Sequence, residues 1–540
     1  MASIEALPSS LARRSSSGAR VGAPVNPWVI AMVVTLATFM EVLDTSIANV
    51  ALPHIAGSLG ATPEESTWVQ SSYLVANAIV LPMSAWLASR VGRKRFYMCC
   101  VVLFTLGSML CGLATSLPLL ILFRVFQGLG GGGLGPSEQA ILADTFTPAQ
   151  RNMGFAIYGM AIVVAPAIGP SLGGWLTDNY TWHWIFFINV PIGIISLFLT
   201  QRLVHDPSHV KQERNKARGK TDYMGITTVV IGVGLLQYVL DKGQELGWFD
   251  SGLICVAAAL AGACLAAMIW REWTYRDPII DLRMLKNRNF ASATLSNFTL
   301  GMVLNGSTIL IPQFLQLQLG YTAERAGWAL SPGGVALALL MPVAGILGSK
   351  FDPRKVIALG FLLTSVSMFC MMRISPEVDF VTVVWMRVFQ VVGLPLIFIP
   401  ISTLAYVGVP KEKNNQVSGI SNFARNLGGA IGVSFLVSFL TRHRQISRIG
   451  LISHLQRGDV FFEGYFSGLT QAAHQRGASM AIAGQQSLAR LQQMVDSQAN
   501  VLAFVSAFFV LGTIVACLIP LPFLMKRPPA QDMATVPGLH

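Results

Sequence analysis

LLILFRVFQGLGGGG, residues 119–133, is an apolar stretch with an arginine and a glutamine in its middle. Its RVFQ core recurs in VVWMRVFQVVGLPLI, residues 383–397. The segment PAQRN, at residues 148–152 after the first copy, is echoed by PKEKN at residues 410–414 after the second. Because the two matches keep nearly the same register, the sequence indicates an internal repeat between the two ends of the chain.

The composition of the 540-residue chain is that of a membrane protein. Hydrophobic residues make up 53% of it and charged residues only 12%, whereas a soluble domain carries about 25% charged residues. A helix of about 20 apolar residues is long enough to cross a hydrocarbon core of roughly 30 Å. We therefore predict an all-α integral membrane protein with fourteen transmembrane helices, at approximately residues 28–50, 66–88, 96–114, 118–142, 153–176, 184–201, 222–241, 251–270, 290–314, 326–348, 355–373, 379–408, 416–440 and 499–524.

The basic residues follow the same alternation of loops. Loops on the cytoplasmic side should hold most of the Lys and Arg, and the basic clusters lie before span one and after spans two, six, eight, ten and fourteen. Both termini are therefore expected in the cytoplasm. The net charge of +12 is explained by this topology, so no nucleic-acid partner is predicted.

The two copies of RVFQ fall in spans four and twelve, an offset of eight spans rather than six. This offset describes two six-helix halves with an extra helical pair inserted between them, the architecture of a secondary transporter with its cavity between the halves. A coincidental repeat and a channel are the alternatives, and the absence of a GxxxxGK[ST] loop favours an ion gradient as the energy source. The predicted parts are a disordered cytoplasmic tail at 1–27, an N-terminal half at 28–201, a linker with helices seven and eight at 202–271, a C-terminal half at 290–525 with an outer loop at 441–498, and a tail at 526–540.

Two carboxylates lie inside span one. Glu41 and Asp44 are three residues apart, so on a helix they share a face, with about 5–6 Å between their Cβ atoms. Two acids that close in a low-dielectric wall do not both ionise easily, which suits a proton carrier. Arg124 of span four lies at a similar depth. We hypothesise that Arg124 pairs with Asp44 and releases it on protonation; a permanent structural pair is the alternative.

Glu138 is a third acid, near the inner end of span four. From there it could form an ion pair with the basic cluster Arg90, Arg93, Lys94 and Arg95, or contact a cationic substrate. We expect the structural role.

Arg387 and Arg425 also lie inside spans and should face the cavity or an acid, because an unpaired guanidinium in lipid is costly. APAIGPSLGGWL, residues 165–176, places Gly and Pro in an otherwise helical run. Small residues let helices approach closely and Pro170 kinks the helix, so span five should form a tight packing seam that can also hold the transporter shut.

No enzyme chemistry is predicted. The seven Cys all fall inside predicted spans without metal-ligand spacing, and the His residues are scattered over loops. No nucleophile with a base at suitable spacing is visible. We therefore expect no metal site, no cofactor and no catalytic residue.

The chain resembles the fourteen-span drug:proton antiporters of the major facilitator superfamily, close to the EmrB multidrug exporters, over roughly residues 28–525. One departure is AWLASRVGRKR, residues 85–95, where Ala85 and Ser89 replace the usual Gly and Asp of the loop after helix two, while Arg90, Gly92 and Arg93 are kept. Glu138 is the candidate substitute for the missing acid. The motifs that carry the resemblance are LDTSIANVALP with Asp44 and Asn49, RVFQGLGGG with Arg124, the helix-five residues Gly169, Pro170, Gly173 and Gly174, WHWIFFINVPIG at 182–193, and SNFARNLGGAIG at 421–432.

The resemblance implies export of amphiphilic toxic compounds across the bacterial inner membrane in exchange for protons, by alternating access. It also implies a periplasmic adaptor and an outer-membrane channel as partners, for which residues 441–498 are a docking surface or, equally, a cap. The alternatives are a dedicated exporter of one metabolite or siderophore, and proton-driven uptake, which the helix-five motif disfavours. The candidate cavity residues are Asn49, Gln127, Arg387, Gln390 and Arg425.

Overall fold

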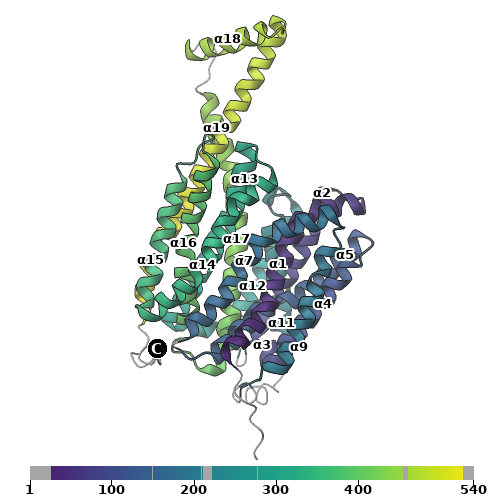
Figure 1. Ribbon diagram of the computed structural model, residues 1–540, viewed down its shortest axis with the longest axis vertical. Helices are drawn as coiled ribbons and strands as arrows, with labels where there is room; N and C mark the ends of the chain where they lie inside the picture. Colours follow the sequence, from purple (N-terminus) through teal and green to yellow (C-terminus); the bar gives the residue numbers. More distant parts are fainter. Residues whose placement is uncertain are drawn as a thin grey trace, which may run out of the picture.

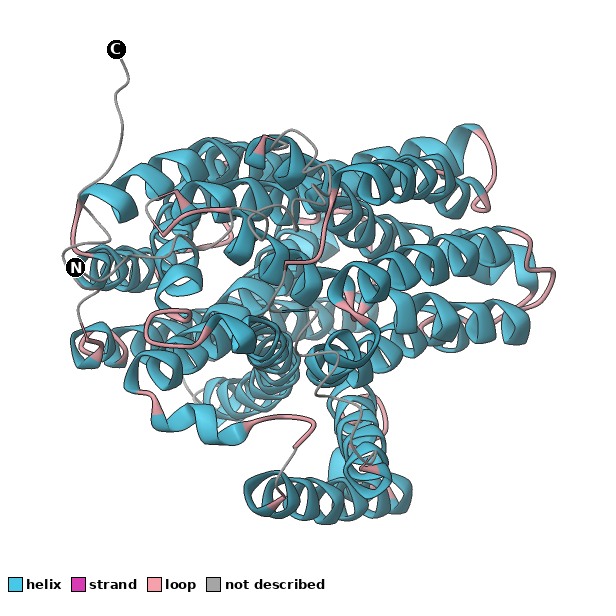
Figure 2. Ribbon diagram, turned by 90° about the horizontal axis from the view of Figure 1, so that it is seen from below, coloured by secondary structure: helices cyan, strands magenta, loops and turns pink. Residues whose placement is uncertain are grey.

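The computed structural model describes residues 26–148, 150–207, 210, 222–275, 278–453 and 460–526. Within these residues the chain consists of helices and connecting loops, without a β-strand (Figure 2). The expected N-terminal tail, apart from its last two residues, and the expected C-terminal tail after Lys526 lie outside the described residues.

Fourteen stretches of the described chain are helical, long and apolar enough to cross a membrane, which confirms the predicted number of spans. Their helices are α1 (Pro27–Leu59), α2 with α3 (Pro63–Ser66 and Trp68–Val91), α4 (Arg93–Gly112), α5 with α6 (Leu117–Gly131 and Leu134–Thr145), α7 (Arg151–Asn179), α8 with α9 (Trp184–Phe187 and Asn189–Leu203), α11 (Tyr223–Lys242), α12 (Gly252–Thr274), α13 (Arg288–Leu319), α14 (Ala323–Lys350), α15 (Pro353–Met371), α16 (Phe380–Leu404), α17 (Asn414–Ser453) and α19 (Met480–Cys517). Shorter helices in the described part of the chain are η1 (Trp248–Asp250), η2 (Leu282–Lys286), η3 (Lys411–Lys413), α18 (Val460–Gln475) and η4 (Leu521–Leu524).

Local sequence sets the ends of these helices. The Asn26 side chain accepts a hydrogen bond from the Trp28 N–H at 3.0 Å, which caps the start of α1. That helix ends at Gly60, whose φ of +63° is a left-handed conformation that glycine adopts without strain. Gly92, with a φ of +100°, forms the turn between α3 and α4. The turn places Arg93 at the first position of α4.

The glycine run after RVFQ lets α5 pack closely between α3 and α4. A Cβ atom at Gly128 would lie 2.5 Å from the Tyr73 carbonyl oxygen of α3, and one at Gly130 would lie 2.5 Å from the Phe104 nitrogen of α4. Only glycine permits both approaches. Arg124, one turn before this run, is thereby held against α3.

The described helices form two packed halves with α11 and α12 beside them (Figure 1). The first half contains α1 to α9 and the second contains α13 to α19. Helix α7 packs against α14 and α16, and α17 packs against α3 and α6, so these helices join the halves. Helix α11 contacts both α3 and α17. The chain therefore has the fold of two six-helix halves with an inserted pair.

The two ends of the bundle differ. Helix α1 begins and η4 ends at one end, which we call the terminal face. At the opposite end α17, α18 and α19 project beyond the other helices (Figure 1). Residues 441–498 are therefore largely helical where described, rather than an extended loop. The ion pair between Arg448 of α17 and Asp496 of α19, at 2.8 Å, links the two sides of this projection.

Candidate functional site

A buried ion pair lies inside the N-terminal half. The Arg124 Nη1 atom of α5 is 2.6 Å from the Asp44 Oδ2 atom of α1, and both side chains are at most 1% exposed. The other oxygen of Asp44 accepts hydrogen bonds from Gln127 at 2.9 Å and from Asn189 of α9 at 2.7 Å. The contact expected between Asp44 and Arg124 is thus present, and the carboxylate is bonded from two further side chains.

Arg124 is satisfied on all sides. Its guanidinium donates to the Val69 carbonyl oxygen at 3.0 Å, to Gln70 at 3.2 Å and to Gln127 at 2.9 Å. The ring of Tyr73 lies 4.5 Å from its central carbon, within the range of a cation–π contact. Four helices therefore position one ion pair, because α1, α3, α5 and α9 each contribute a partner.

Glu41 lies one turn from Asp44 and faces a different set of partners. Its carboxylate accepts from the Asn77 amide at 2.9 Å and from the Tyr73 hydroxyl at 3.4 Å. Glu41 forms no ion pair in the described part of the chain, and its side chain is only partly buried. Tyr73 links the two acids, since its ring contacts Arg124 and its hydroxyl contacts Glu41.

Glu138 does not join the basic cluster after α3, which corrects one of the two contacts considered for it. Its carboxylate accepts from the hydroxyl groups of Thr35, at 2.5 Å, and Thr38, and it is fully buried. Arg93 instead forms its ion pair with Asp144 of α6. The acid that pairs with the loop arginine is therefore Asp144, which lies just beyond the predicted end of span four and was not predicted as a partner.

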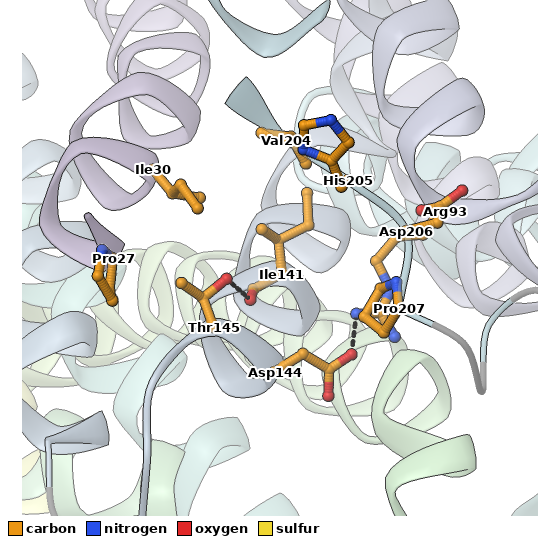
Figure 3. A pocket seen from close by; sticks show the side chains of 10 residues that line it. All are labelled: Pro27, Ile30, Arg93, Ile141, Asp144, Thr145, Val204, His205, Asp206 and Pro207. Atoms are coloured by element: carbon orange, nitrogen blue, oxygen red, sulfur yellow. Dashed lines mark hydrogen bonds and ion pairs between the residues drawn. The ribbon is translucent and has the colours of Figure 1, made fainter. Parts of the chain in front are cut away.

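The Arg93–Asp144 pair joins the two halves at the terminal face. Arg93 donates to Asn415 of α17 at 2.7 Å and to the Ala140 carbonyl oxygen at 3.0 Å. Asn414, the neighbour of Asn415, donates to Asp144 at 2.6 Å. Figure 3 shows the ion pair between Arg93 and Asp144. We call the cluster of Arg93, Asp144, Asn414 and Asn415 the terminal latch.

Two other residues of the loop after α3 lie outside this cluster. The Arg90 guanidinium lies over the Trp86 ring, and Gly92 supplies the turn.

Further hydrogen bonds between the halves lie on the same side of the bundle. Asn152 of α7 donates to Ser349 at 3.3 Å and accepts from Thr403 at 2.5 Å. Deeper in the bundle, Asn422 of α17 donates to Gln139 at 2.8 Å. Arg425 donates to Asn422 at 2.6 Å and to Tyr158 of α7 at 3.3 Å. The described polar contacts between the halves thus run from the terminal face to the middle of the molecule.

The RVFQ repeat has the same local geometry in both halves. Arg387 donates to Gln390 at 2.6 Å, as Arg124 does to Gln127. Arg387 has no carboxylate partner among the described residues, and its buried Nε atom has no hydrogen bond. The ion pair is therefore a property of the N-terminal copy. Asn49, another candidate cavity residue, is exposed on α1.

The glycines of α7 do not all serve the predicted seam. A Cβ atom at Gly173 would lie 2.9 Å from the Ile47 side chain of α1, and one at Gly169 would overlap the Ser46 hydroxyl. A Cβ atom at Gly174 would meet nothing within 4 Å. Pro170 lies on the exposed face of α7. The seam between α7 and α1 thus uses Gly169 and Gly173, and Gly174 lies outside it.

This seam predicts a difference between neighbouring substitutions. Gly173→Val should destabilise the protein by about 1–3 kcal/mol, because it overpacks the contact with Ile47. Gly174→Val, the matched control, should have little effect, because the added side chain meets open space. Thermal unfolding of the purified variants in detergent measures both. Equal losses in the two variants would show that the α7–α1 contact is not the cause.

A buried acid–guanidinium pair inside one of two packed six-helix halves defines a membrane transporter of the secondary type. A family model described as "Major Facilitator Superfamily" matches residues 34–433. The chain is 34% identical over 501 residues to the multidrug export protein EmrB of Escherichia coli (strain K12), covering 93% of this chain and 95% of that protein. It is 36% identical over 494 residues to the fatty acid resistance protein FarB of Neisseria gonorrhoeae, covering 91% and 95%.

Solved structures agree on the fold. The proton:xylose symporter XylE superposes with a TM-score of 0.55 at 14% identity, over 89% of this chain and 99% of that one. The chain belongs to the Major Facilitator Superfamily and, within it, to the EmrB-type exporters. It is a multi-pass membrane protein of a transporter family and not of an enzyme class.

Proposed function

We propose that this protein exports amphiphilic toxic compounds across a bacterial inner membrane in exchange for protons. The observation that carries the proposal is the Asp44–Arg124 pair, which places a titratable group in the membrane interior beside a charge that must be compensated. Relatives named for multidrug export and for fatty acid resistance support amphiphilic substrates. Arg387, Gln390 and Arg425 from the second half, with Asn49 and Gln127, are the proposed substrate-side residues.

In this proposal Asp44, Arg124 and Glu41 couple proton binding to the change of conformation. Protonation of Asp44 removes the charge that holds Arg124, and breaking a buried pair by neutralising one partner costs about 3–5 kcal/mol. One proton crossing about 150 mV supplies roughly 3.5 kcal/mol. The two energies are of similar size, so the gradient supplies much of the energy that release of the pair requires. Glu41, which forms no described ion pair, takes the proton from the proposed substrate cavity between the two halves.

The same proposal assigns the sides of the membrane. The basic residues near the ends of α3, α12 and α14 lie at the terminal face, so that face is cytoplasmic by the distribution of positive charge. The two termini then lie in the cytoplasm, and the terminal latch closes the cytoplasmic side in the conformation described. Opening toward the cytoplasm requires that the terminal latch, which contains Arg93 and Asp144, be broken. The contact between α7 and α1 at Gly169 and Gly173 stays intact.

The projection of α17 to α19 is the proposed docking surface for a periplasmic adaptor, which in turn would reach an outer-membrane channel. In the assigned orientation it extends away from the cytoplasm. Ile446, Ile449 and Ile452 are exposed on its α17 side at intervals of one turn. Such an apolar row on a solvent-facing helix suits contact with a helical partner.

Reconstitution of the purified protein into liposomes tests the proposed function. With an acidic interior, ethidium should accumulate inside because protons leave as the drug enters. Addition of a protonophore should abolish the accumulation, and liposomes without protein should show none. If neither ethidium nor any of a panel of other amphiphiles accumulates in response to the pH gradient, proton-driven drug export is wrong. A dedicated exporter of one metabolite then becomes the better hypothesis.

A further inference from the structure

Glu138 is an acid at a position where the described contacts require only a hydrogen-bond acceptor. Its carboxylate is fully buried in α6 and accepts from the hydroxyl groups of Thr35 and Thr38, one turn apart on α1. No Lys, Arg or His in the described part of the chain pairs with it. An ionised carboxylate without a counter-charge is costly at this depth. The uncharged form, which needs a proton, removes that cost.

A cavity of about 280 Å³ opens at the terminal face and is lined by residues of α1 and α6 (Figure 3). Helix α6 runs toward this face, and Ile141 lies one turn, about 4.5 Å, beyond Glu138 along it. From α1, Ile30 points into the same cavity. The polar groups around it include the paired Arg93 and Asp144. The full lining is Pro27, Ile30, Arg93, Ile141, Asp144, Thr145, Val204, His205, Asp206 and Pro207. Ile141, which lines the cavity together with Ile30, is thus one helical turn from Glu138, and we call these two side chains the apolar layer.

On its other side Glu138 lies within electrostatic reach of Glu41 of α1. Thr35, Thr38, Glu41 and Asp44 follow one another at intervals of three residues, so each is a neighbour of the next in a row that winds around the helix. The row is about 13.5 Å long at 1.5 Å per residue. Glu138 is bonded to its first two members, and Glu41 is the next. The row therefore extends from the Asp44–Arg124 pair to the layer above the cavity.

The other ionisable groups that face Glu138 are few. Glu41 of α1, Tyr97 of α4 and Tyr158 of α7 lie within electrostatic reach of its carboxylate. Arg425 of α17 acts on Glu41 and Tyr158 from across the interface between the halves. Helix α3 contributes the polar groups that hold Glu41. None of these residues neutralises an ionised Glu138 by direct contact.

We propose that Glu138 is the residue that exchanges protons with water at the terminal face. This inference rests on the proposed proton-coupled export. A proton leaves the Glu138 carboxyl for water in the terminal-face cavity, and the carboxylate is then protonated by the carboxyl of Glu41. The Thr35 and Thr38 hydroxyls hold both forms. From Glu41 to the terminal face the proton route stays within the N-terminal half, and the layer of Ile30 and Ile141 limits leak.

The test uses liposomes containing the full-length protein. Glu138→Gln keeps the shape of the side chain, with an oxygen that accepts from one threonine and an NH2 group that can donate to the hydroxyl of the other. It cannot exchange a proton, so ethidium accumulation driven by a pH gradient should fall at least about tenfold. Exchange of labelled for unlabelled ethidium without a gradient should fall far less. Glu138→Asp should retain more gradient-driven transport than Glu138→Gln. Glu272→Gln, which removes another fully buried acid in α12, is the matched control and should behave as the wild type.

A purely structural Glu138 predicts the opposite order, since Gln preserves the shape of the side chain and Asp does not. Normal gradient-driven transport by Glu138→Gln would overturn the inference while leaving the wild-type function intact. If the wild type itself does not accumulate ethidium under a pH gradient, both this inference and the proposed function are wrong. If Glu138→Gln does not fold, Ile141→Ser gives an independent answer. This variant should increase proton leak into liposomes relative to the control Ile194→Ser, which lies on the exposed face of α9. Equal proton leak in the two variants would contradict the proposed proton route.

Discussion

Asp44→Asn is expected to abolish accumulation of substrate under a pH gradient. The carboxylate holds Arg124, Gln127 and Asn189 together in the middle of the N-terminal half. An amide cannot be deprotonated, so the protein loses the group whose charge changes during transport. The measurement is ethidium accumulation in liposomes with an acidic interior, together with binding of ethidium to the purified protein, which should change far less than transport.

The variant also leaves Arg124 buried without a counter-charge, which costs about 3–5 kcal/mol. The double variant Asp44→Asn with Arg124→Gln removes both charges and should recover stability without recovering transport. Asp241→Asn, which changes an acid bonded to Ser71 outside the pair, is the matched control and should transport normally. If the double variant accumulates substrate like the wild type, the pair has only a structural role.

Arg93→Ala should shift the protein toward a conformation open at the terminal face. The substitution removes the ion pair with Asp144 and the hydrogen bond to Asn415 in the other half. A loss of about 3–5 kcal/mol from one conformation changes its population relative to the other by a factor of roughly 10² to 10³ or more. Spin labels at Ser89 and Lys411, on opposite halves near this face, should therefore report a longer distance.

Arg354→Ala is the control for this experiment. Arg354 pairs with Asp352 at 3.0 Å within the C-terminal half at the same face, so its loss breaks no contact between the halves. The distance between the labels should stay as in the wild type. If Arg93→Ala and Arg354→Ala give the same distance distribution, the terminal latch does not hold the halves together.

The fold was largely predictable because a membrane imposes simple rules on sequence. Apolar length predicted the spans, and the repeated RVFQ predicted which spans correspond. The helix ends were less predictable: α17 and α19 continue far past the apolar residues, and the two helices contact each other, with the Arg448–Asp496 ion pair joining their extensions. Hydropathy carries no signal for that partner.

The site was predictable where one charge required another. The depth of Arg124 and Asp44 predicted their contact. The partners of Glu138 and Arg93 were not predictable in this way, since several acids and bases lay at compatible depths and only the packing of α6 against α1 and α17 separates them. The roles of Asn189 and Tyr73 were missed for a related reason: a single polar residue in an apolar span has no preferred partner until the helices are placed.

The most direct test of proton coupling at Asp44 is proton release on substrate binding. The purified protein in weakly buffered detergent solution receives ethidium, and the pH change is recorded for the wild type and for Asp44→Asn with Arg124→Gln. By linkage, a ligand that competes with protons must displace them. The wild type should release protons, and the double variant should release about one fewer per molecule. Equal release by the two proteins would contradict coupling through Asp44.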